Sequence, residues 1–246
     1  TKRFITACIP TYSYGHTFDI FSLINICKKK KIRIIEDASE ALGSFFKKKH
    51  AGTFGEISSF STHPLKNLSS LGDGGFVVTN KKSYYEKIKL YRNHGLYSRD
   101  SAIIYGVNSR LDSVSAKVLS YRLKNLNSNI NKRRKNVKLY EKYLTSSRIK
   151  IAQKSNEKEN SYVMFLTICE KRDKLQKYLK RRGIQSLVYY GRPMHLHPVA
   201  KKMNLTKSKF KMAENVCKKV LALPIHQYLN EKQIKYICSQ INKFYK

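Results

Sequence analysis

One lysine of this chain lies among residue types that differ from those around most of its other lysines. Lys66 falls within STHPLKNLSSLGDGGFVVTN, residues 61–80, between a Ser/Thr/His group and a glycine-rich turn. Most other lysines have lysine neighbours or polar helix faces, whereas small and hydroxylated residues surround Lys66. This setting is typical of a buried, reactive amine rather than a solvated charge.

Two polar residues are expected near Lys66 because each ends a strand-like run. Asp37 ends IRIIED, and Ser61 lies at the end of ISSFS, five residues before Lys66. In open parallel sheets, ligands bind outside the carboxyl ends of strands. Asp37 can bind a cation or cap the next turn, and Ser61 can hold a phosphate or bond its own backbone. The GDGG glycines permit close backbone approach, although an ordinary turn explains them too.

Taken together, these residues indicate a particular cofactor. A lysine that forms a Schiff base, an aspartate that pairs with a protonated ring nitrogen, and a hydroxyl for a phosphate are what pyridoxal 5'-phosphate requires. The set is more specific than any of its members alone.

The elements that must position these residues follow a β-α-β order. RFITACIP, FDIFSLINICKKK and IRIIEDA predict a strand, a helix and a buried parallel strand. ISSFST and GFVVTN predict two more strands around the lysine loop. KSYYEKIKLYRNHG predicts a helix closed by Gly95, and residues 110–144 predict a long amphipathic helical stretch with a bend in its middle.

The remainder of the chain has a different pattern. KSNEKENS, residues 154–161, is polar and predicts a loop at or near a boundary. YVMFLTI and IQSLVYY predict strands on either side of a helix closed by Gly183, and two helices are expected at 207–221 and 231–245. We therefore predict a large α/β domain over residues 1–150 and a smaller α+β domain over residues 151–246.

Composition limits the possible functions. Fifty Lys and Arg residues against sixteen Asp and Glu give a net charge of +34 over 246 residues, which raises a nucleic-acid or anionic-membrane hypothesis. The basic residues are scattered, without a basic arm or nucleic-acid motif, and this favours a lysine-biased surface.

The five cysteines form no CxxC pair, which argues against a zinc site or disulfides and favours a reducing, cytoplasmic environment. No membrane-spanning run or signal peptide is visible.

Four segments resemble, in order and spacing, the DegT/DnrJ/EryC1/StrS family: EDASEALGS, GTFGEISSFSTHPLKNLSSLGDGGFVVTN, LYRNHGL and GVNSRLD. The resemblance extends through PMHLHP and LALPIH and so covers nearly all of the chain. It implies a pyridoxal-phosphate-dependent sugar aminotransferase of the aspartate-aminotransferase (type I) fold. That fold has a large domain with a central, mostly parallel sheet and a smaller C-terminal α+β domain.

The resemblance also implies a role for each cofactor-binding residue. Lys66 matches the lysine that links covalently to the cofactor and acts in catalysis. Asp37 matches the aspartate that pairs with the pyridine nitrogen, and Ser61 matches the serine that holds the phosphate. Glu40 occupies a position, often glutamine, beside the ring hydroxyl of the cofactor.

Two further residues follow from the resemblance alone. Asn108, in GVNSRLD, matches an asparagine that reaches the cofactor phosphate of the neighbouring subunit, which implies a homodimer with shared active sites. His195, in PMHLHP, lies in a loop that can face the sugar-nucleotide pocket, and a purely structural role is equally open. No metal site is expected.

The implied reaction moves an amino group from glutamate to a nucleotide-linked keto-sugar, for a surface polysaccharide or a related glycan. The sequence does not distinguish C3 from C4, although KNL…GDGG favours C3 slightly. Family relatives that dehydrate their substrates can replace the lysine with histidine, so the presence of Lys66 favours transamination. The segment that precedes the first strand in the family is expected to be missing here. An inactive remnant or regulator, and a basic nucleic-acid-binding protein, remain alternatives.

Overall fold

The computed structural model describes residues 4–152, 160–203 and 210–246, and the chain divides into two compact units. The first unit comprises residues 1–131 and 156–163, and the second comprises residues 132–155 and 164–246. The division falls inside helix α4 (Leu126–Tyr143), whereas sequence analysis placed the boundary at residue 150. A continuous helix contains no turn or linker in its sequence that could signal a division. The division is seen only in the contacts that the two parts of α4 make within their own units. Most of the predicted 154–161 loop lies outside the described residues.

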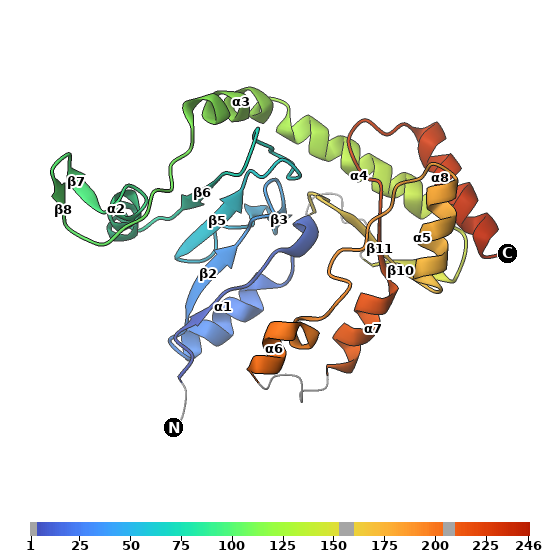
Figure 1. The fold of residues 1–246 in the computed structure, drawn as a ribbon, viewed down its shortest axis with the longest axis horizontal. Helices are drawn as coiled ribbons and strands as arrows, with labels where there is room; N and C mark the ends of the chain where they lie inside the picture. The colour runs from blue at the N-terminus through green and yellow to red at the C-terminus, as the bar shows by residue number, and fades with distance from the viewer. Residues whose placement is uncertain (1–3, 153–159, 204–209) are drawn as a thin grey trace. The chain divides into compact units, whose positions relative to one another are not determined.

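A four-stranded sheet forms the centre of the first unit, in the order β1-β2-β5-β6 (Figure 1). The strands β1, β2 and β5 run parallel, and β6 pairs antiparallel with β5. Their bounds are β1 (Ala7–Cys8), β2 (Arg33–Asp37), β5 (Ile57–Ser61) and β6 (Gly75–Val78). The sheet confirms the predicted α/β class with a mostly parallel sheet.

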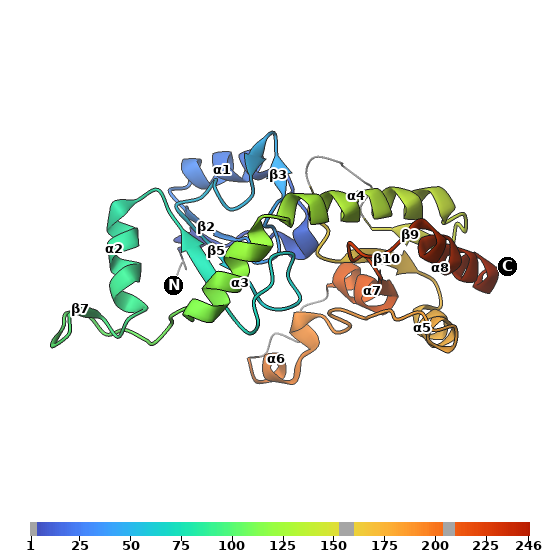
Figure 2. The ribbon, with the colours of Figure 1, turned by 90° about the horizontal axis from the view of Figure 1, so that it is seen from above.

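Helix α1 (Ile20–Lys29) is the crossover between β1 and β2, as the β-α-β pattern predicts, and it packs against β2 (Figure 2). The helix begins after Asp19, whose carboxylate accepts a hydrogen bond from the Ser22 amide at 3.2 Å. Such a cap supplies an acceptor for one of the free amides at a helix start. Under the loops around the sheet lies a core formed by five buried residues: Tyr12, Ala38, Ala41, Ala51 and Phe60.

The other elements of the first unit lie around this sheet. They are a 3-10 turn (Ser13–Gly15), β3 (Phe45–Phe46), β4 (Lys49–His50), α2 (Lys82–Tyr91), β7 (Leu96–Ser98), β8 (Ser101–Ala102) and α3 (Ser113–Leu123). The long helical stretch predicted for residues 110–144 is indeed interrupted, because two residues separate the end of α3 from the start of α4. Gly95 follows α2 at φ +73, and a Cβ there would lie 1.7 Å from the Ile104 carbonyl oxygen. Glycine is therefore required at that turn.

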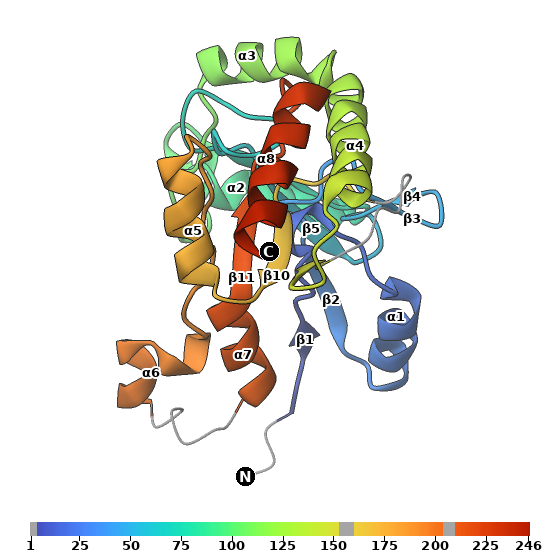
Figure 3. The same cartoon turned by 90° about the vertical axis from the view of Figure 1, so that its right-hand side faces the viewer.

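The second unit contains a three-stranded antiparallel sheet in the order β11-β10-β9. Figure 3 shows α5 and α8 beside its strands. The elements are β9 (Ile149–Ile151), β10 (Phe165–Cys169), α5 (Arg172–Arg181), a 3-10 turn (Met194–Leu196), α6 (Pro198–Lys202), α7 (Lys211–Lys219), β11 (Val220–Leu223) and α8 (Glu231–Phe244). The α+β character agrees with the predicted class of the C-terminal part.

Two predictions for this unit are wrong. The helix expected to end at residue 221 ends at Lys219, and the next four residues form β11, all buried. The four residues of β11 are all apolar, which is typical of a strand covered on both faces. Periodicity alone did not show where α7 ends and this strand begins. The strand expected at residues 184–190 is reduced to one bridge between Leu187 and Ala222.

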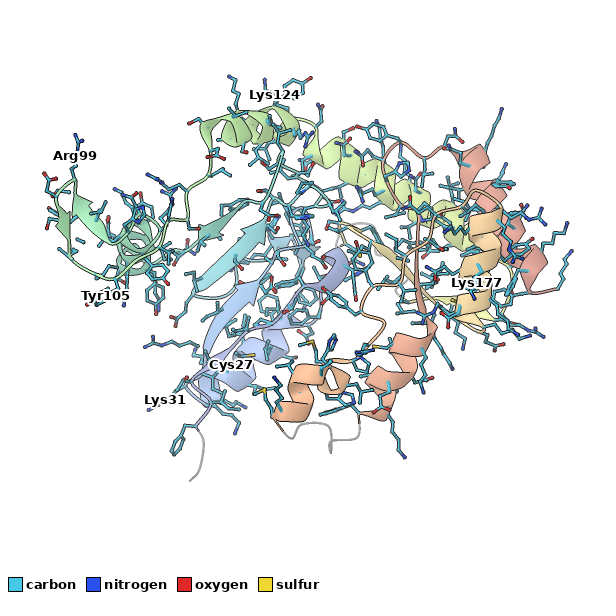
Figure 4. All side chains as sticks on the ribbon, in the orientation of Figure 1. Cys27, Lys31, Arg99, Tyr105, Lys124 and Lys177 are labelled. Atoms are coloured by element: carbon cyan, nitrogen blue, oxygen red, sulfur yellow. The ribbon has the colours of Figure 1, made fainter. Side chains whose placement is uncertain are left out.

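The basic residues are spread over separate elements. Figure 4 labels exposed basic side chains in the α1–β2 turn (Lys31), the β7–β8 hairpin (Arg99), the end of α3 (Lys124) and α5 (Lys177). These four residues come from both units of the chain. Within the part of the chain that the structure describes, no helix has the length and apolar character needed to cross a membrane.

Candidate active site

Lys66 lies in a short loop that leaves the carboxyl end of β5. The loop is closed at its base by a hydrogen bond from the Ser70 amide to the Thr62 carbonyl at 2.7 Å. A tighter turn inside it joins the Lys66 amide to the His63 carbonyl at 2.8 Å. The hydroxyls of Thr62 and Ser70 are buried and have no hydrogen-bond partner among the described residues. The base of the loop that carries Lys66 therefore contains two buried hydroxyls without a described hydrogen-bond partner.

The amine of Lys66 is held by Glu40. Lys66 Nζ lies 2.8 Å from Glu40 Oε1, and the two side chains are 19% and 10% exposed, respectively. Glu40 Oε2 accepts a hydrogen bond from the Tyr14 amide at 2.5 Å. A carboxylate with so little exposure needs partners of this kind. The Glu40 carboxylate consequently links the lysine loop to the chain at Tyr14 and fixes the direction of the amine.

Asp37 and Ser61 end adjacent parallel strands, β2 and β5, at the same edge of the sheet. Asp37 Oδ1 accepts a hydrogen bond from the Ser39 amide at 3.1 Å, and Ser61 Oγ accepts one from the His63 amide at 3.2 Å. Both side chains thus take part in the local turns that the sequence left open as an alternative. Neither contact uses the hydroxyl hydrogen of Ser61 or the second carboxylate oxygen of Asp37, which is 3.5 Å from the Thr11 hydroxyl.

His16 directly follows the Tyr14 turn in the chain and is 6% exposed. Its Nδ1 is 3.3 Å from the Ser13 carbonyl, and its ring meets the Tyr162 ring edge-on at 5.3 Å. Burial lowers the pKa of His16 from 6.5 to about 4, against smaller opposite effects of the Ser13 carbonyl and the Glu40 charge. The imidazole is therefore neutral near pH 7.

The protein is expected to lose stability as its His16 protonates. Because the folded pKa of about 4 lies below the ordinary 6.5, the unfolded chain takes up a proton first as the pH falls. The stabilisation is complete above pH 6.5 and is lost as the pH drops to about 4, by roughly 3 kcal/mol. Urea unfolding at a series of pH values measures this loss.

The comparison that isolates His16 uses two variants. His16→Gln should lose less stability between pH 7 and pH 4 than the wild-type protein, by about the same 3 kcal/mol. His94→Asn replaces an exposed histidine at φ +58, a conformation that asparagine tolerates, and should retain the wild-type slope. Equal slopes for His16→Gln and the wild type would contradict this account.

The other two predicted site residues have partners of their own. Asn108 is exposed in the first unit, where its side-chain oxygen accepts a hydrogen bond from Arg110 Nε at 3.1 Å. His195 is in the second unit, 8% exposed, with Nε2 3.0 Å from Glu214 Oε1 and its ring 4.8 Å from that of Phe210. These contacts give His195 a structural role in its own unit, and its predicted contact with substrate stays a prediction.

Sequence reasoning missed two groups that build the site. Glu36, next to Asp37, is fully buried and accepts hydrogen bonds from Tyr12 and from the amides of the loop after β4. A carboxylate inside an apolar strand was the available signal. The segment 160–163 contacts the Tyr14 turn and the residue after Lys66. No local pattern connects it with Lys66, because the two are almost a hundred residues apart.

The sequence and the fold both match known proteins. The chain is 34% identical over 98% of its length to a "pleiotropic regulatory protein" of Geobacillus stearothermophilus. It is 31% identical over 97% of its length to the dTDP-3-amino-3,4,6-trideoxy-alpha-D-glucose transaminase of Streptomyces venezuelae. The crystal structure of S. venezuelae DesV in complex with a ketimine intermediate superposes with a TM-score of 0.93 at 30% identity, over 98% of this chain.

The chain spans between 63% and 65% of the length of these relatives. The match to the family extends over residues 1–242 and so includes both units. It also includes Lys66, Glu40, Asp37 and Ser61 at the edge of the sheet. The chain therefore belongs to the DegT/DnrJ/EryC1/StrS aminotransferase family.

Proposed function

We propose that this protein transfers an amino group to a nucleotide-linked keto-sugar with the help of pyridoxal 5'-phosphate. The observation that carries the proposal is the Lys66 amine, held 2.8 Å from Glu40 at the sheet edge where Asp37 and Ser61 end their strands. The names of three relatives are a dTDP-sugar transaminase, a UDP-sugar 3-aminotransferase and a GDP-perosamine synthase. These names support the substrate class.

The residues present fit this cofactor. It needs a primary amine, a carboxylate and a hydroxyl, and Lys66, Asp37 and Ser61 supply them from adjacent segments. The buried hydroxyls of Thr62 and Ser70, which find no partner among the described residues, are further donors near the lysine loop. When bound, pyridoxal phosphate supplies an aldehyde carbon and an electron-withdrawing ring that stabilises a neighbouring carbanion.

Each residue of the chain then has a distinct task. Lys66 Nζ would hold the aldehyde carbon of the cofactor, and the same nitrogen would take up and return a proton as general base and acid. Glu40 Oε1 orients that nitrogen by accepting a hydrogen bond from it. Asp37, placed by β2, would keep the ring nitrogen protonated, and the Ser61 hydroxyl would donate to the phosphate.

We further propose glutamate as amino donor and C3 of the sugar as the acceptor position. Three of the matched relatives carry a 3-amino group or a 3-aminotransferase activity in their names, although two others are named for a 4-amino sugar. The net charge of +34 favours approach of an anionic sugar nucleotide. The products fit the synthesis of a surface polysaccharide or a related glycan.

The test is an assay of the purified protein with pyridoxal phosphate, labelled glutamate and a panel of 3-keto and 4-keto sugar nucleotides. Mass spectrometry should find the label in an amino sugar, with 2-oxoglutarate formed in equal amount. If the cofactor binds but no sugar nucleotide is aminated, the enzymatic proposal fails. That result would favour a regulatory role, which the name of the Geobacillus relative also suggests.

We also propose that the protein is a homodimer in which Asn108 completes the site of its partner. The support is its exposure outside the Lys66 site, together with the family resemblance. Mixing inactive Lys66→Ala and Asn108→Ala subunits should restore up to about a quarter of the wild-type turnover, because a hybrid dimer keeps one intact site. No recovery, after subunit exchange has been verified, would show that each site is built from one chain.

A further inference from the structure

Four residues distant in sequence return to the lysine loop. Asn160–Val163 belong to the first unit and are buried, with exposures between 0% and 7%. At one end, Asn160 Oδ1 accepts a hydrogen bond from the Thr17 amide at 3.1 Å. At the other end, the Val163 amide donates to the Tyr14 carbonyl at 3.1 Å. The segment therefore runs along the Tyr14 turn, whose amide also binds Glu40.

Ser161 lies at the centre of this segment and contacts three parts of the site. Its amide donates to the Gly15 carbonyl at 2.9 Å, and its hydroxyl donates to the Glu40 carbonyl at 3.3 Å. Its carbonyl accepts a hydrogen bond from Asn67 Nδ2 at 2.9 Å. Asn67 directly follows Lys66, and Glu40 is the partner of the Lys66 amine. Ser161 thus contacts Glu40 itself and the residue that follows Lys66.

The approach of Ser161 to the Tyr14 turn is close. A Cβ on Gly15 would lie 2.4 Å from Ser161 Oγ and 3.1 Å from the Glu40 carbonyl oxygen. Gly15 also has φ +81, a conformation that side chains disfavour. The fit leaves Ser161 little freedom, so its hydroxyl and carbonyl hold their partners at fixed positions.

We propose that Ser161 is a positioning residue for Lys66: through Asn67 and the Glu40 main chain it fixes both halves of the Lys66–Glu40 pair. The inference rests on the proposed role of Lys66 as the cofactor-binding amine. Without these two hydrogen bonds, the lysine loop and the Glu40 turn move independently, and the amine leaves its carboxylate more often. A merely structural serine would change stability and leave Lys66 unaffected.

The test measures how fast Lys66 reacts in the cofactor-free protein. Brief reductive methylation with isotopically labelled formaldehyde, followed by digestion and mass spectrometry, gives the rate at each lysine. In the wild type, Lys66 should react more slowly than exposed lysines, because Glu40 holds the amine and its side chain is 19% exposed. Ser161→Ala and Asn67→Ala each remove one hydrogen bond and should raise the Lys66 rate about fivefold.

Ser58→Ala is the matched control. Ser58 is 2% exposed in the same unit, and its hydroxyl likewise donates to a main-chain carbonyl, that of Gly52. It should lose a similar amount of stability with no change in the Lys66 rate. If Ser161→Ala does not fold, Asn67→Ala decides alone, because its side chain is only partly buried.

An unchanged Lys66 rate in folded Asn67→Ala and Ser161→Ala, or an equal rise in Ser58→Ala, overturns the proposal. The measurement needs neither cofactor nor turnover, so it can fail or succeed independently of the proposed function. A faster Lys66 in a protein that aminates no sugar would keep the positioning role and remove the enzymatic one. Turnover by the wild-type protein, with an unchanged Lys66 rate in both variants, would keep the enzymatic proposal and remove the positioning role.

Discussion

We expect Lys66→Ala to lower transamination by at least about a thousandfold, because the variant lacks both the covalent link to the cofactor and the general base. The same change should abolish the label that borohydride fixes between pyridoxal phosphate and the protein at this residue. Peptide mass spectrometry locates the label, and a sugar-nucleotide assay measures turnover. Loss of both, in a folded protein, would assign the reactive amine to Lys66.

Two other variants separate the amine from its charge. Lys66→Arg retains a cation that can pair with Glu40, but a guanidinium does not form the covalent link. It should therefore be as inactive as Lys66→Ala. Lys81→Ala removes a lysine of the same unit that pairs with Glu56 at 2.9 Å and should keep both turnover and label. A label that persists at full strength in Lys66→Ala would refute the assignment.

The part of the site that sequence could predict depends on regular structure. Because β2 and β5 are parallel neighbours, residues at their carboxyl ends must share one edge of the sheet. Asp37, Ser61 and the loop with Lys66 follow from that rule together with the apolar runs before them. Figure 1 shows these strands side by side.

The remainder depends on contacts that no periodicity encodes. Glu40 was expected beside the cofactor, yet its bond to the Tyr14 amide requires a turn at φ +64 that the residue type does not suggest. Ser161 reaches the site only because the chain returns to the first unit after α4 and β9. In the second unit, the first two residues of β11 were assigned to a helix because its four apolar residues continue directly from α7.

Glu36 carries the largest stability effect that we expect from a single conservative substitution. Its carboxylate is fully buried and accepts hydrogen bonds at 2.6 Å from the Tyr12 hydroxyl and 2.8 Å from the Gly52 amide. Two more come from the amides of Phe54 and Gly55, at 2.6 Å and 2.5 Å. Burial and the bond to Glu36 raise the pKa of Tyr12, so its hydroxyl stays a donor.

Glu36→Gln should lower the free energy of unfolding by about 3 kcal/mol. An amide group has one oxygen, which can serve Phe54 and Gly55. Its nitrogen then faces Tyr12 and Gly52. The Tyr12 hydroxyl can rotate to accept a hydrogen bond, but the Gly52 amide cannot, so one buried donor loses its acceptor and the remaining bonds lose their charge.

The measurement is urea unfolding followed by far-UV circular dichroism, since the chain has no tryptophan. Glu56→Gln is the control in the same unit: its side chain is 29% exposed and pairs with Lys81, so the change should cost less than about 1 kcal/mol. Tyr12→Phe removes one donor and should fall between the two. If Glu36→Gln were no less stable than Glu56→Gln, the buried carboxylate would not be what holds the loop after β4 against the sheet.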